Sequence, residues 1–137
     1  MLHALGVLAA ALVLGGMALF SFVMAPLVFR VLERETAATF MRAAFPRYYD
    51  TMMGAAIIAA GLTGLRDLID AVLMGGVAAA FILLRHALLP ALNRHRAARQ
   101  AGDAAAEAAF RRLHGLSMVV NLLQMAVVAF VVVRLVT

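Results

Sequence analysis

Four stretches of mostly apolar residues make up the greater part of this chain. They cover about residues 4–29, 47–65, 68–92 and 113–133. A helix that crosses the hydrocarbon core of a bilayer needs roughly 20 apolar residues. The chain is 66% hydrophobic and 14% charged, whereas soluble domains average about 45–50% apolar and about 25% charged. We therefore predict an all-α integral membrane protein, a four-helix bundle in which residues 1–137 form a single transmembrane domain.

The basic residues are all arginine, as expected of a GC-rich bacterial gene, and they are divided unevenly between the ends of these stretches. Arg66 and Arg134 lie on one side. The other ten lie on the opposite side, at positions 30, 34, 42, 47, 85, 94, 96, 99, 111 and 112. Cytoplasmic loops carry an excess of basic residues. The sequence thus predicts a bacterial inner (plasma) membrane protein with two long cytoplasmic connections and both termini on the other side, in contact with lipid rather than nucleic acid.

The first cytoplasmic connection has the pattern of an amphipathic helix. Between Glu35 and Pro46, apolar residues recur with helical spacing, at Ala37, Phe40, Met41, Ala44 and Phe45. This pattern predicts a short helix that lies in the membrane interface or covers the end of the bundle. In the second connection, Gly102 ends one helix and Asp103 is a candidate N-cap for the next.

One face of the last apolar stretch is polar. His114, Ser117, Asn121 and Gln124 are spaced 3, 4 and 3 residues apart, so they share a helix face. Asn and Gln side chains are costly in contact with lipid, so the stripe is expected to face the bundle interior. Interhelical hydrogen bonding alone would explain such residues, at about 0.6 kcal/mol each on average. A file of four polar residues headed by a histidine favours a ligand-binding interior.

The sequence also limits which other groups could contact a ligand. With no cysteine, a metal would have to be bound by His, Met or oxygen ligands. His86 and His114 both lie toward the cytoplasmic side and could share a ligand, whereas His3 starts at the outer side. Arg85 could meet a carboxylate or phosphate beside them. Further candidate ligand contacts are Arg30 and Tyr49.

Several segments resemble a known family. They are Leu2-His3, Phe29-Arg30-Val31-Leu32-Glu33-Arg34, Phe45-Pro46-Arg47-Tyr48-Tyr49, and Leu113-His114-Gly115-Leu116-Ser117 with Asn121-Leu122. The chain resembles a bacterial member of the uncharacterised family typified by eukaryotic transmembrane protein 205, a domain of unknown function of the DUF4149 type. The resemblance implies a four-helix membrane protein without an assigned biochemical role.

A more distant similarity concerns the HemJ and CopD membrane proteins. It rests on Leu2-His3, Gly15-Gly16, the exit from Pro26 to Phe29, and His86 late in the third stretch. It implies a b-type haem or copper, with His3 or His86 as a haem ligand. HemJ proteins carry a characteristic lysine in the third span and this chain has none, so only haem or copper binding carries over.

Three functional hypotheses follow. The first is a non-enzymatic membrane protein whose polar interior binds a small ligand or helps to move one. The second is a haem b- or copper-binding redox protein of HemJ-like or CopD-like ancestry. The third is a structural subunit that forms a homo-oligomer or joins a larger membrane complex. No catalytic residue is assigned, because no acid is placed to orient His114 and hydrolytic chemistry has no basis.

Overall fold

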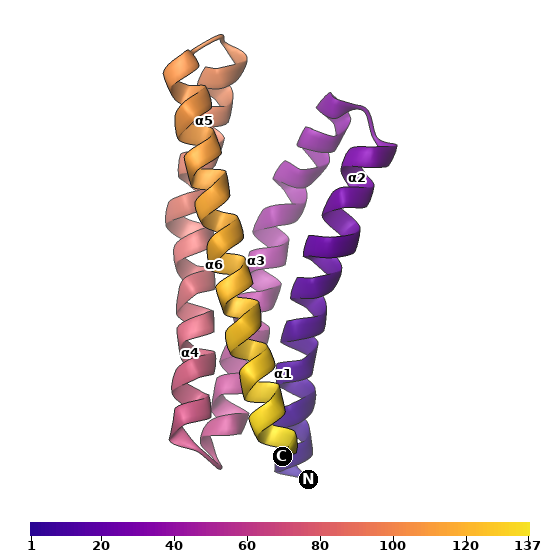
Figure 1. Cartoon of the computed structure of the whole chain (residues 1–137), viewed down its shortest axis with the longest axis vertical. Helices are drawn as coiled ribbons and strands as arrows, with labels where there is room; N and C mark the ends of the chain where they lie inside the picture. Colours follow the sequence, from indigo (N-terminus) through magenta and orange to yellow (C-terminus); the bar gives the residue numbers. More distant parts are fainter.

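The computed structural model describes all 137 residues and contains four long antiparallel helices (Figure 1). The first long helix comprises α1 (Leu2–Ala18), the π-helical turn η1 (Leu19–Met24) and α2 (Ala25–Val31), and the second is α3 (Arg34–Gly64). The third comprises α4 (Leu68–Leu83), the π-helical turn η2 (Leu84–Leu88) and α5 (Leu89–Gln100), and the fourth is α6 (Ala104–Val136). The all-helical fold predicted from the sequence is confirmed.

The helices are separated by short turns that local side chains stabilise. Asp67 accepts a hydrogen bond from the backbone N–H of Ile69 at 2.7 Å at the start of α4. Asp103 accepts hydrogen bonds from the N–H groups of Ala105 and Ala106 at the start of α6, as predicted. Gly102 before it has a φ of 91°, a conformation that other residues rarely adopt. These caps satisfy backbone donors that an uncapped helix end leaves free.

The expected short amphipathic helix is not a separate element. Residues 35–46 form the first part of α3, which continues through Pro46 as one helix of 31 residues. A proline removes a single intrahelical hydrogen bond, and the helical pattern on both sides of Pro46 keeps the chain helical. The second predicted stretch, residues 47–65, is therefore the second half of a longer helix.

Three of the long helices are apolar and long enough to cross a membrane: Leu2–Val31, Leu68–Gln100 and Ala104–Val136. The α3 helix is not among them; it carries charged residues that include Arg42, Arg47 and Asp50. These three helices are consistent with a membrane protein.

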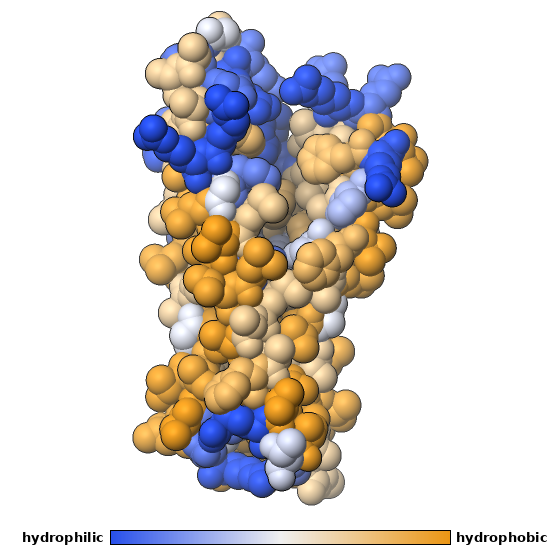
Figure 2. Space-filling model, viewed as in Figure 1, coloured by the Kyte–Doolittle hydropathy of each residue, from blue (hydrophilic) through white to orange (hydrophobic).

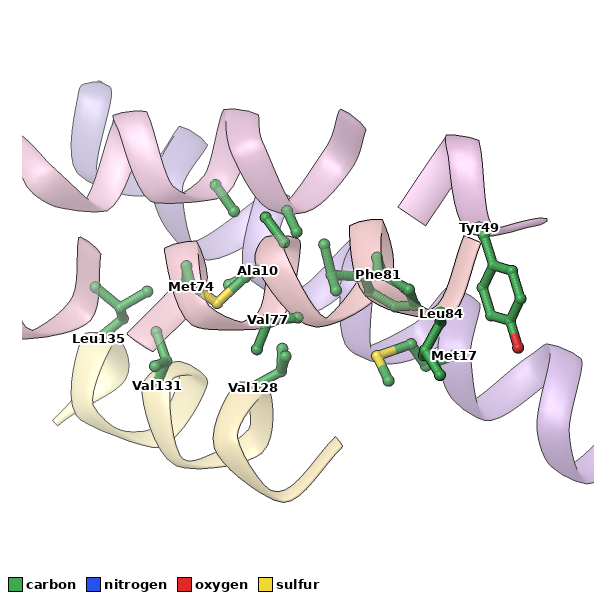
Figure 3. Close-up of a cluster of buried hydrophobic side chains, with 14 of the residues drawn as sticks. Ala10, Met17, Tyr49, Met74, Val77, Phe81, Leu84, Val128, Val131 and Leu135 are labelled. Carbon is green, nitrogen blue, oxygen red and sulfur yellow. The ribbon is translucent and has the colours of Figure 1, made fainter. Parts of the chain in front are cut away.

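The helices pack closely toward the end of the molecule that holds both termini and the turn between α3 and α4, which we call the closed end (Figure 1). Side chains from α1, α3, α4 and α6 fill the space between them (Figure 3). Met17, Met74, Phe81, Val128 and Val131 are completely buried in this core. The core therefore joins all four long helices.

The opposite end, which we call the open end, holds the turns between α2 and α3 and between α5 and α6. Here the α2/α3 pair diverges from the α5/α6 pair (Figure 1). The π-helical turns η1 and η2 lie just before Pro26 and Pro90 in the two helices that lead into these pairs. A proline lacks an N–H and its ring collides with the carbonyl four residues earlier, and a π-helical turn is one cause of a bend in a helix. We attribute the divergence of the two pairs to these turns.

Charged side chains hold the closed end together. Arg134 of α6 donates hydrogen bonds to Asp67 and Asp70 at the start of α4, both at 2.8 Å. The Asp70 side chain is only 4% exposed. Arg66 contacts His3 nearby. Figure 2 shows hydrophilic residues gathered at this end of the molecule.

We predict that Arg134→Gln destabilises the fold, because it leaves the buried Asp70 carboxylate without a cation. Thermal unfolding in detergent is expected to show a clearly lower midpoint than in the wild type. Arg112→Gln is the matched control, since Arg112 is exposed and makes no ion pair. Equal midpoints for the two variants would contradict this role of Arg134.

Candidate functional site

A cleft of about 600 Å³ opens between the diverging helix pairs. All four long helices contribute to its wall, and 14 of its 21 lining residues are hydrophobic. Figure 2 shows it as a hollow with hydrophobic side walls and hydrophilic residues on the upper rim. This volume and this mostly apolar lining with a few polar groups are typical of small-molecule sites.

Three polar side chains from different helices meet at the floor of the cleft. Asn121 of α6 donates a hydrogen bond from Nδ2 to Ser21 Oγ of η1 at 2.9 Å. Tyr48 of α3 donates from its hydroxyl to Asn121 Oδ1 at 3.4 Å. Asn121 therefore links the two diverging pairs at the point where they separate.

Aromatic rings line the α3 side of the cleft. Tyr48 stacks on Phe20 with 4.1 Å between ring centroids. Tyr49 packs between Phe45 and Phe81, and its hydroxyl points away from the hydrophobic core (Figure 3). Tyr48 and Tyr49 are the only tyrosines in a chain without tryptophan. Both line the cleft, so tyrosine fluorescence reports on this site. Tyr48 also lines a second pocket with Phe40 and Met52.

Basic side chains form the rim of the cleft at the open end. The guanidinium groups of Arg96 and Arg99, from α5, lie 5.5 and 4.4 Å from the ring centroid of Phe110 of α6. Arg99 also pairs with Glu107 at 3.4 Å. Arg96 has no such partner, and its Nη1 atom is buried without a hydrogen bond. His114 lies one turn along α6 from Phe110, with the two rings nearly parallel.

Four of the predicted ligand contacts lie in this cleft: His114, Ser117, Asn121 and Tyr49. Ser117 donates its hydroxyl hydrogen bond to the carbonyl of His114 at 2.7 Å. The polar stripe of α6 thus faces the cleft over most of its length.

The other predicted ligand contacts do not line the cleft. Gln124 lies in the core, where its Nε2 donates to the Val77 carbonyl at 3.0 Å and its Oε1 has no partner. Arg85 pairs with Asp50 of α3 at 3.0 Å, and Arg30 is exposed at the end of α2. Gln124 and Arg85 each contact an acceptor on a neighbouring helix, the Val77 carbonyl and the Asp50 carboxylate. These contacts result from helix packing, which the sequence does not reveal.

The predicted metal-binding histidines are not gathered at one place. His114 lines the cleft and His86 does not, while His3 lies beside Arg66 at the closed end. No group of three or more His, Asp or Glu side chains could hold a metal ion. The three histidines predicted as metal ligands therefore lie at separate places in the structure.

Sequence reasoning missed Arg96, Arg99, Phe110, Ser21 and Tyr48 as cleft residues. The arginines were counted only for orientation. A usable signal was present, since Arg96 and Arg99 are spaced i, i+3 and so share a helix face.

The DUF4149 family model, described as a domain of unknown function, matches residues 8–101. The chain belongs to this family. The match covers α2 to α5 and α1 from residue 8 onward, and it ends before α6, the helix that contributes His114 and Asn121 to the cleft. No curated protein and no solved structure matches the chain.

We predict that Ser21 and Asn121 are energetically coupled. A double-mutant cycle of Ser21→Ala and Asn121→Ala, measured by unfolding in detergent, is expected to give a coupling of about 0.6 kcal/mol, the average for polar contacts between membrane helices. A second cycle of Ser21→Ala and Ser117→Ala is the control. It is expected to give none, because Ser117 bonds within its own helix. Equal coupling in both cycles would contradict a stabilising hydrogen bond between Ser21 and Asn121.

Proposed function

We propose that this DUF4149 protein is a four-helix membrane bundle whose cleft binds a small amphiphilic molecule. One observation carries the proposal: the cleft joins mostly hydrophobic walls to a hydrogen-bonded floor and a basic rim. An amphiphile presents the complementary surfaces, an apolar body and a polar end. The protein then acts by binding or helping to move its ligand.

The distribution of charge supports a membrane location for all four helices. His114 and Arg134 are 20 residues apart on α6, which is about 30 Å at roughly 1.5 Å per residue. That distance equals the thickness of the hydrocarbon core, about 30 Å. Between these two boundaries, the Asp50 carboxylate of α3 forms an ion pair with Arg85 of η2. This pairing lowers the cost of placing α3 in lipid.

The asymmetry of the arginines supports an orientation with the open end in the cytoplasm. The closed end, with both termini and the α3–α4 turn, then lies on the other side. In a bacterium this corresponds to the inner membrane.

The redox alternative has less support. Of the four histidines, only His114 lines the cleft, and neither His86 nor His3 lies there with it. Binding of an amphiphile by apolar walls and hydrogen bonds does not require several histidines in the cleft.

The absence of native cysteine makes the topology directly testable. We expect Leu65→Cys, in the α3–α4 turn, and Thr137→Cys to react with a membrane-impermeant maleimide in intact spheroplasts. Gln100→Cys, at the open end, is expected to react only after permeabilisation. All three positions are exposed. If α3 did not cross, Leu65 would lie on the same side as the exposed Glu33 of the α2–α3 turn. Labelling of Glu33→Cys and Leu65→Cys under the same condition would therefore contradict the four-span bundle.

Ligand entry into the cleft is testable through Tyr48 and Tyr49. We expect tyrosine fluorescence of the detergent-solubilised protein to be quenched saturably by a phosphatidylcholine with brominated acyl chains. Ala25→Phe, which places a ring in the cleft wall, is expected to weaken the quenching.

Ala11→Phe is the matched control, since Ala11 is exposed on the same long helix and lies outside the cleft. It should behave like the wild type. Quenching that does not saturate, or that is the same in both variants, would overturn the proposed function.

A further inference from the structure

We propose that the ligand of the cleft is an anionic membrane phospholipid, with its phosphate at Arg96 and Arg99 and an acyl chain between η1/α2 and α6. This inference rests on the proposed function and specifies the class of its ligand.

The first argument is the unsatisfied charge of Arg96. Its Nη1 is buried without a hydrogen-bond partner, and no carboxylate forms an ion pair with it. Arg42 of α3 and Arg99 lie near enough to repel its charge. Burying an unpaired charged donor among other cations is costly. Arg96 lines the cleft, so an anion there would neutralise its charge, and an arginine is well suited to bind a phosphate with two hydrogen bonds.

The second argument is that the basic groups are held in place. The Phe110 ring lies against both Arg96 and Arg99, and Glu107 fixes Arg99 from another direction. Contact with an aromatic face restrains a guanidinium while its N–H groups stay free to donate. The rim is thus organised before a ligand binds.

The third argument is depth in the bilayer. With Arg134 at one boundary of the hydrocarbon core, His114 lies at the other. Phe110, with Arg96 and Arg99 beside it, lies one helical turn further out, about 6 Å. Asn121 lies seven residues inward, about 10 Å into the hydrocarbon. The basic rim is therefore at the depth of lipid headgroups and the apolar walls at the depth of acyl chains.

The fourth argument is lateral access. Large apolar residues on both sides of the cleft are exposed: Phe22 and Phe29 on η1 and α2, and Met118 and Leu122 on α6, each more than half exposed. In a membrane these side chains contact lipid. A lipid can therefore enter sideways between η1/α2 and α6 while its headgroup stays at the surface.

The test is native mass spectrometry of the detergent-solubilised full chain with equimolar phosphatidylglycerol and phosphatidylcholine of identical acyl chains. We expect phosphatidylglycerol to bind preferentially. Arg96→Gln is expected to reduce this preference about tenfold, the effect of losing a charge-assisted hydrogen bond. Arg94→Gln is the matched control, because it removes the same charge from an exposed position of α5 outside the cleft. It should keep the preference.

A third sample tests the headgroup alone. Glycerol 3-phosphate is expected not to displace phosphatidylglycerol, because it lacks the acyl chain that the walls would hold. Displacement at similar concentrations would show a site for a soluble phosphate and overturn the lipid proposal. Equal binding of the two phospholipids, or equal loss of preference in the Arg94 and Arg96 variants, would overturn it as well.

These failures are distinguishable from failure of the proposed function. Saturable quenching of Tyr48 and Tyr49 by brominated phosphatidylcholine tests entry of an acyl chain without regard to charge. If Arg96→Gln keeps that quenching while losing its preference for phosphatidylglycerol, the variant is folded and only recognition of the anion is lost.

Discussion

The cleft depends on how two helices accommodate a proline. Pro26 and Pro90 each follow a π-helical turn, and the two helix pairs diverge beyond these turns. A bilayer offers no water to satisfy a backbone group that has lost its partner, so the helix itself must adjust around the proline ring. Toward the closed end, where no proline interrupts the helices, the side chains form one continuous core. The same four helices therefore build a packed half and an open half.

The degree to which polar side chains are paired changes from the closed end to the open end of the molecule. At the closed end, Arg134 is fully paired with Asp67 and Asp70. At the floor of the cleft, Ser21, Tyr48 and Asn121 satisfy one another across three helices. At the rim, Arg96 keeps a buried donor without a partner. The polar groups at the closed end and at the floor of the cleft are thus paired within the chain, whereas Arg96 carries an unpaired charge in the wall of the cleft.

The predictions from sequence succeeded where a property is local to one helix. Hydropathy located the three long apolar helices, and Asp103 was recognised as a cap from its own neighbours. Helical spacing placed His114, Ser117 and Asn121 on one face, and all three line the cleft. The same reasoning did not show that residues 35–46, predicted as a short separate helix, are the first part of α3, which continues through Pro46.

The sequence by itself determined an all-helical chain of largely apolar helices, the positions of most turns, and the polar face of α6. The tertiary structure decided which of those polar groups are free. Gln124 and Arg85 found partners on neighbouring helices, while Arg96 and Arg99 converged on Phe110 across the rim of the cleft. The physical reason is that periodicity is a property of one helix, whereas a cleft is a space between helices. Its shape depends on where the helix axes bend and on which side chains meet across the gap.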